Sequence, residues 1–316
     1  MWWFVPLLAA AAAAADPTFE LIGRILPPPD GRASVSVYGA TSPFTTAALS
    51  DELGRFTVKK LEPGTYTVAV FLPGRGEARQ TIEVGPGTAD SRNRVAISLN
   101  LKDADFTTDA LKRRHAVSAK ELTIPDKAVR EYEDAQKDLE KHQTAAAVKH
   151  LEAAVEIAPQ FSGAWNNLGT IAYQTRKFLR AEECFRKALK QDPEAYEPLV
   201  NLGGVLINLR KLDEAMEYNL HAVLVRPNDA LANSQLGMTY FELKRPDLAE
   251  KYFVRARQLD PAHFSHPQLF LAEIHLQRGN KRATADDLED FLRQHPDWPE
   301  AAKMRETIAK LREEPR

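Results

Sequence analysis

The sequence predicts a two-domain protein, in which an all-β antiparallel sandwich is followed by an all-α superhelical solenoid. The first observation is an alternation of apolar and polar residues within residues 17–101, which is typical of short strands. The second is a repeat of 34 residues within 125–316, which is typical of stacked helix pairs. Residues 102–124, between these regions, show neither period and are interpreted as a linker.

The chain begins with an apolar segment that has the features of a targeting signal. Residues 2–15 carry no polar side chain, and Asp16 ends the run. The run is shorter than the roughly 20 residues of a bilayer-spanning helix. Ala13 and Ala15 have the small-residue spacing of a cleavage site, so residues 1–15 are predicted to be a signal peptide of a periplasmic or secreted bacterial protein. An uncleaved helix that tethers the protein to a membrane is the alternative, because no Lys or Arg precedes the run.

Short strands are predicted throughout residues 17–101. Six segments have the required alternation, at 19–25, 34–38, 55–58, 65–71, 79–84 and 95–99, and a weaker one lies at 45–49. Turns rich in Gly, Pro and Asp separate most of them, at 27–31, 51–54, 62–64, 73–74 and 85–87. About seven short strands at this spacing predict a small antiparallel sandwich.

One motif within this region resembles a known family. Asp51, Gly54 and Phe56 are followed by Leu61, Pro63, Gly64 and Tyr66. This pattern resembles the carboxypeptidase regulatory-like family, and the resemblance implies a transthyretin-type sandwich. It also implies a module without an active site of its own, whose usual setting is outside the cytoplasm.

The 34-residue repeat is defined by small residues and prolines. The recurring sets are Leu168, Leu202 and Leu236; Gly169, Gly203 and Gly237; Ala181, Ala215 and Ala249; and Pro193, Pro227 and Pro261. Small residues let two helices approach closely, and the proline ends the second helix of each pair. The repeats are predicted at 128–161, 162–195, 196–229, 230–263 and, after a one-residue insertion, 264–298, with a capping helix at 299–313.

The second repeat carries the clearest resemblance to a family. Its defining positions are Trp165, Leu168, Gly169, Ala181, Phe185, Ala188 and Pro193. This pattern resembles the tetratricopeptide repeat (TPR) family. The resemblance implies that the first helix of each pair lines a concave face, and that the array binds proteins or peptides rather than performing a reaction.

Charge and motifs argue against nucleic-acid binding and against catalysis. The net charge is −2, and the one basic cluster, Lys112-Arg113-Arg114, is too small for a polyanion site. Zinc-peptidase, nucleophile-elbow and P-loop motifs are absent from the sequence. No catalytic residue, metal ligand or cofactor is therefore predicted.

Cysteine and histidine side chains often take part in catalysis or metal binding. Cys184 is the only cysteine, which excludes an intrachain disulfide, and it is interpreted as a small packing residue. His263 and His266 have metal-like spacing. Without a third ligand they are expected to be surface histidines.

The concave face of the predicted solenoid offers a row of amides. Asn167, Asn201 and Gln235 hold one position in three successive repeats. A carboxamide both donates and accepts, so each could pair with the N–H and C=O of an extended peptide. Helices stack ~10 Å apart and a strand advances ~3.3 Å per residue, so about every third peptide residue would be contacted. The surrounding candidates are Asn166, Thr170, Tyr173, Gln174, Asn208, Met238 and Phe241. The alternative is that these amides only cap or solvate the helices.

These features together predict a non-enzymatic adaptor or scaffold of the cell envelope. It would bind an extended peptide or a partner protein in the concave groove, and it would touch a membrane only through an uncleaved N-terminal segment. A structural component of envelope assembly, with the sandwich as main binding element, is one alternative. An accessory subunit of an enzyme is another.

Overall fold

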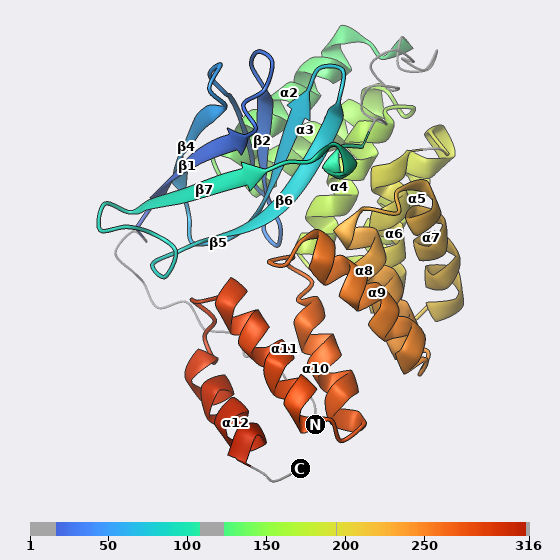
Figure 1. Cartoon of the computed structure of the whole chain (residues 1–316). Helices are drawn as coiled ribbons and strands as arrows, with labels where there is room; N and C mark the ends of the chain where they lie inside the picture. The colour runs from blue at the N-terminus through green and yellow to red at the C-terminus, as the bar shows by residue number, and fades with distance from the viewer. Residues whose placement is uncertain (1–16, 108–122, 194, 314–316) are drawn as a thin grey trace.

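A computed structural model describes residues 17–107, 123–193 and 195–313 (Figure 1). The predicted signal segment, 1–15, and most of the predicted linker lie outside these residues. Within the described part of the chain, no helix is long and apolar enough to cross a membrane. The predicted fold class is confirmed, since a β-sandwich precedes a solenoid of helix pairs.

In the part of the chain that the structure describes, seven strands build the sandwich. They are β1 (Phe19–Leu26), β2 (Ser34–Gly39), β3 (Thr45–Leu49), β4 (Arg55–Leu61), β5 (Gly64–Leu72), β6 (Gly76–Val84) and β7 (Arg94–Asn100). Sheet A has the order β4-β1-β7, and sheet B has the order β3-β2-β5-β6. The pairs are antiparallel except β1 with β7, which run parallel.

The alternation read from the sequence decides which side chains enter the core between the two sheets. Leu21, Val35, Val68 and Leu99 point inward and are no more than 1% exposed. Fully burying one such side chain contributes about 1.5–3 kcal/mol. The sandwich therefore has a hydrophobic core of its own, separate from that of the helices.

Residues at the start of the predicted linker extend the sandwich. A 3-10 turn spans Asp103–Asp105. Beyond it, Thr107 and Glu77 exchange backbone hydrogen bonds of 2.8 and 3.1 Å. Part of the free edge of β6 is thus paired by the chain that leaves the sandwich.

Among the described residues, ten helices form five antiparallel pairs, and an eleventh follows. The pairs are α2 (Asp126–Glu140) with α3 (Thr144–Ile157), α4 (Ser162–Gln174) with α5 (Phe178–Gln191), α6 (Tyr196–Asn208) with α7 (Leu212–Val225), α8 (Ala230–Glu242) with α9 (Pro246–Leu259), and α10 (Pro267–Gln277) with α11 (Lys281–Gln294). The last helix is α12 (Ala301–Glu313), which packs on α11.

Close packing explains the repeated glycines. A Cβ atom on Gly169 would lie 2.6 Å from the ring of Phe185, and one on Gly237 would lie 2.9 Å from the ring of Phe253. In the repeat between them, Gly203 faces the buried Asn219 in the same way. Only glycine lets the first helix of each of these pairs lie this close to the second.

The turn within each pair has a repeated backbone conformation. Four non-glycine residues 34 positions apart have a positive φ, namely His142 (57°), Arg176 (60°), Arg210 (61°) and Lys244 (59°). The fifth turn has Gly279 (71°), which is 35 positions after Lys244. The offset of one coincides with the longer connection between α9 and α10.

The sandwich lies against the solenoid with the outer face of sheet B. Ala69 and Thr81 belong to this outer face, because their neighbours along each strand enter the core, yet both are only 2% exposed. Figure 1 shows the helices curving around one side of the sandwich, from α2 and α4 to α10 and α11. The predicted binding face of the solenoid is therefore next to another part of the same chain.

Candidate functional site

The predicted amide row links neighbouring first helices of the solenoid. Asn167 Nδ2 donates to the Tyr132 hydroxyl at 3.0 Å, which connects α4 to α2. Asn201 Nδ2 donates to Asn166 Oδ1 at 3.3 Å, which connects α6 to α4. Asn208 Nδ2 donates to the Tyr173 hydroxyl at the same distance. The structure thus brings these candidates together as bridges between repeats.

The remaining candidates are more deeply packed than a peptide site requires. Gln235 is only 5% exposed, and its amide lies against Gly204. Met238 and Phe241 belong to the apolar cluster between α8 and α10, where Phe241 packs edge-on against Phe270 at 5.5 Å. Thr170 donates to the backbone of its own helix. Gln235, Met238 and Phe241 therefore stabilise the packing of helices against one another, whereas Thr170 is bonded within α4.

Gln174 makes a different kind of contact. Its Nε2 donates to the backbone carbonyl of Gly39 at 3.0 Å, and Gly39 is the last residue of β2. This amide at the end of α4 therefore binds the main chain of an extended segment. That is the type of contact expected from the amide row, made here within one molecule.

A second row of contacts runs along the edge strand β6. Alternate residues of β6 meet successive repeats: Arg79 lies 3.4 Å from Glu197, the Thr81 N–H donates to Asp260 Oδ2 at 2.9 Å, and Glu83 lies 3.0 Å from His295 Nδ1. Glu197 is in turn 3.5 Å from Arg226. Repeats three, four and five are thus each bridged to one strand.

Asp260, His295 and Arg226, which is the partner of Glu197, share a position in the repeat. Arg226, Asp260 and His295 each precede the proline that ends a helix pair, and they lie 34 and 35 residues apart. All three are no more than 6% exposed. We name this set, Arg226, Asp260 and His295, the pre-proline row.

Asp260 is the acidic member of this row and is 5% exposed. Burial raises its pKa to about 6, and the hydrogen bonds from Thr81 oppose that rise. Its second oxygen, Oδ1, has no hydrogen-bond partner in the described part of the chain. An unsatisfied buried oxygen costs about 1–3 kcal/mol, so this contact is only partly compensated.

The loop after β6 contacts the end of the solenoid. The backbone N–H of Gly87 donates to both carboxylate oxygens of Asp297, at 2.7 and 2.8 Å. Gly85 is also close, since a Cβ atom there would lie 3.9 Å from the Asp297 Cβ. At the other end, the His142 ring stacks on Phe44 at 4.8 Å and lies 3.8 Å from Glu62. The sandwich is held from the first repeat to the last.

The expectation that His263 lies on the surface was wrong, whereas His266 is half-buried. His263 is 4% exposed, and its Nδ1 lies 2.6 Å from the Ser265 hydroxyl. Burial lowers the pKa of His263 to about 3. His266 packs against His295 and Trp298. Burial is the larger cause, and the nearby His295 the smaller one, that lower the pKa of His266 to about 4. No group of side chains in the described ranges is suited to hold a metal ion.

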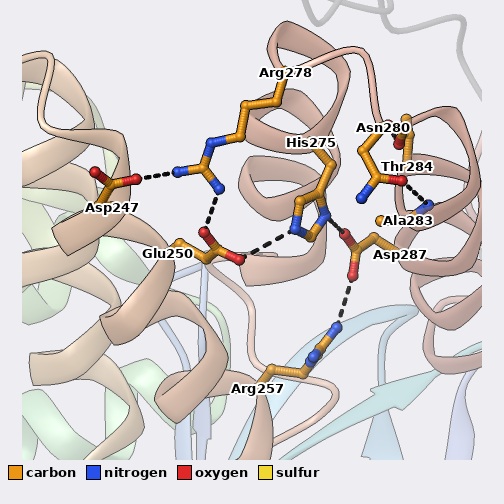
Figure 2. Close-up of polar contacts among 9 residues, drawn as sticks. All are labelled: Asp247, Glu250, Arg257, His275, Arg278, Asn280, Ala283, Thr284 and Asp287. Atoms are coloured by element: carbon orange, nitrogen blue, oxygen red, sulfur yellow. Dashed lines mark hydrogen bonds and ion pairs between the residues drawn. The ribbon is translucent and has the colours of Figure 1, made fainter.

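Another polar cluster joins α9, α10 and α11 (Figure 2). His275 lies between two carboxylates, with Nδ1 2.7 Å from Asp287 and Nε2 3.2 Å from Glu250. Asp287 also pairs with Arg257 at 2.7 Å, and Arg278 pairs with Glu250 at 2.5 Å. Burial raises the pKa of Asp287, against the hydrogen bond from His275. Every group here has a partner, so the cluster ties helices together and presents no reactive side chain.

The sequence reasoning missed the pre-proline row because it searched the first helices only. A signal was present, since the residue before each fixed proline is polar or charged in every repeat from the second to the fifth: Asp192, Arg226, Asp260 and His295. Cys184, in contrast, is buried as predicted, and burial raises its pKa to about 11.

Family models match both domains. Residues 23–99 match the model of the carboxypeptidase regulatory-like domain. Residues 162–194, 196–229 and 230–263 match three tetratricopeptide repeat models. The first and fifth helix pairs lie outside these ranges and continue the same stack.

Several curated proteins are similar to part of this chain. The type IV pilus assembly protein PilF of Pseudomonas aeruginosa is 28% identical over 124 residues, which cover 39% of this chain and 49% of PilF. The human cell division cycle protein 16 homolog is 28% identical over 116 residues, which cover 34% of this chain and 19% of that protein. This chain therefore spans less than half the length of either relative.

Solved structures resemble the solenoid. PilW, a type IV pilus biogenesis factor, aligns with a TM-score of 0.52 and 21% identity, covering 58% of this chain and 85% of PilW. MamA from Desulfovibrio magneticus RS-1, from residue 41 onward, aligns with a TM-score of 0.50 and 19% identity, covering 56% of this chain and 99% of MamA. At these identities the likeness shows the fold alone. The family matches and the helix stack agree that this chain is a tetratricopeptide repeat protein with an N-terminal carboxypeptidase regulatory-like domain.

Proposed function

We propose that this chain is a non-enzymatic interaction scaffold of the bacterial cell envelope, whose solenoid binds an extended segment of a partner protein on its concave face. The observation that carries the proposal is the hydrogen bond from Gln174 to the carbonyl of Gly39. It supports main-chain recognition by an amide at the end of a first helix. This single contact does not depend on the side chain of the residue that it reaches, because a carboxamide pairs with the backbone.

The envelope location rests on two further observations. The apolar segment at residues 1–15 has the composition of a secretory signal. One relative, PilF, is a pilus assembly protein. Binding on a preformed solenoid has little folding cost, so a short segment would suffice for a specific contact.

The test is selection of peptides from a random library on the whole chain, followed by titration of a recovered peptide. The Asn167→Ala/Asn201→Ala variant removes two members of the amide row. Gln258→Ala, an exposed amide on α9, is the matched control. We expect at least about tenfold weaker binding for the double variant, since a lost hydrogen bond of about 1.4 kcal/mol is a factor of ten. Unchanged helical circular dichroism would show that the stack is intact.

Equal affinity of the double variant and the wild-type chain would refute binding through the amide row.

A second candidate function has support from a depression on the outer face of sheet A, lined by Ile22, Arg24 and Arg55. That face lies away from the sheet B contacts. A peptide whose binding is lost on Arg24→Ala but not on Asn167→Ala/Asn201→Ala would assign binding to the sandwich.

A further inference from the structure

Strand β6 meets the solenoid as an extended ligand would. Arg79, Thr81 and Glu83 occupy alternate positions, so they face the same side of the sheet. They contact repeats three, four and five in order, through Glu197, Asp260 and His295. A step of two residues along the strand therefore corresponds to one repeat of the solenoid.

The lengths of the side chains compensate for the different spacing of strand and repeats. Alternate strand residues are ~6.8 Å apart, and stacked helices are ~10 Å apart. The central contact uses the main-chain N–H of Thr81. The outer contacts use the long side chains of Arg79 and Glu83, which extend toward the neighbouring repeats.

The contacts are also complementary in charge. A basic residue of the strand meets a carboxylate, a main-chain donor meets a carboxylate, and an acidic residue meets an imidazole. Gly87 adds a second main-chain donor to Asp297. Such polar pairing fixes the register of the strand along the repeats.

The interface has the character of one that opens. Hydrogen bonds and ion pairs connect the two domains at Gln174, Asp260 and Asp297, and Asp260 Oδ1 remains unpaired within the described residues. Polar interfaces between domains of one chain usually permit relative motion. A contact that leaves a buried oxygen unpaired has free energy to gain from release.

We propose that β6 is an internal ligand of the solenoid, and that a partner displaces it by presenting an extended strand with the same alternation. The partner strand would carry a basic residue at position i, a small residue at i+2, where only the main-chain N–H is used, and an acidic residue at i+4. This inference rests on the proposed function, because it names the partner class of the same solenoid. It places the partner along the pre-proline row.

A reversible disulfide tests the proposal within one protein. Gly85→Cys with Asp297→Cys places two Cβ atoms about 3.9 Å apart in the docked state, and disulfides span 3.5–4.5 Å. Cys184 is buried and does not compete. The oxidised chain holds β6 in place, and the reduced chain can release it while its sequence stays identical.

The probe is a labelled peptide of residues 76–88, which contains Arg79, Thr81 and Glu83. The control peptide carries Arg79→Glu and Glu83→Arg. We expect the reduced chain to bind the probe at least about tenfold more tightly than the oxidised chain, and to bind the control peptide at least about tenfold more weakly than the probe.

Three outcomes would overturn the inference. They are failure of the disulfide to form under mild oxidation, similar binding or no binding by the oxidised and reduced chains, and similar binding of the two peptides. A library-selected peptide that depends on Asn167 and Asn201 but binds both redox forms alike would refute displacement and leave the proposed function standing. If the library-selected peptide does not depend on Asn167 and Asn201, but the probe binds the reduced chain more tightly than the oxidised chain, the proposed function is refuted and displacement stands.

Discussion

His263 is predicted to make the solenoid sensitive to acid. The ring is 4% exposed, and its Nδ1 accepts a hydrogen bond from the Ser265 N–H at 3.3 Å. Burial lowers its pKa from 6.5 to about 3 in the folded chain. Because the folded pKa is the lower one, the stabilisation is present above pH 6.5 and is lost as the pH falls toward 3.

The magnitude follows from the two pKa values. Each unit of difference between folded and unfolded pKa corresponds to about 1.4 kcal/mol, so the difference between 6.5 and about 3 amounts to at most about 5 kcal/mol. Between pH 7 and pH 5, only the unfolded chain takes up the proton. The free energy of unfolding should therefore fall by about 2 kcal/mol over this interval because of His263.

The assay is urea unfolding at pH 5, 6 and 7, followed by helical circular dichroism. His263→Asn keeps an acceptor near the Nδ1 position and does not titrate. His221→Asn, at an exposed position of α7, is the matched control. We expect the His263→Asn variant to lose about 2 kcal/mol less than the wild-type chain between pH 7 and 5. The same pH slope in both chains would refute the reasoning.

Two further predictions concern the sandwich contact and the helical turns. Asp260→Asn should change pH dependence in the opposite direction. Burial raises the folded pKa of Asp260 from 3.8 to about 6. The free energy of unfolding of the wild-type chain should therefore fall by up to about 3 kcal/mol because of Asp260 as the pH rises from about 4 to above 6. The variant should not show this loss. Parallel curves of unfolding free energy against pH for the two chains would contradict this. Arg176→Gly should raise the free energy of unfolding by about 1 kcal/mol, because Arg176 has φ 60° and a left-handed residue other than glycine is strained. Thermal unfolding measures the gain, Arg176→Val should lower stability, and a loss with glycine would contradict the strain argument.

The fold was predictable because it depends on local period. Leu202 and Leu236 recur with the repeat and are fully buried, and Val35 and Val68 alternate along strands and enter the sandwich core. Even the one-residue insertion was visible, and Gly279 shows its place in the backbone. Such features need only neighbours in sequence or in the next repeat.

The site was predicted less well because it depends on contacts between distant segments. The candidates Asn167 and Asn201 are bonded to neighbouring helices, and Gln235 is buried. Thr81 and Asp260 are 179 residues apart, and no period relates a strand to a solenoid turn. The burial of His263 has the same origin, since its side chain lies in the longer connection before α10.

The attachment of one sandwich to five repeats changes how the helices respond to stress. In an ordinary solenoid each repeat contacts only its neighbours, so the array unfolds by progressive unzipping from an end. Here the first repeat is attached through His142 and the last through Asp297, by way of a single rigid body. The sandwich therefore restrains the solenoid from the first repeat to the last. Release of the sandwich would remove this restraint. The superhelix could then change its pitch when it binds a partner.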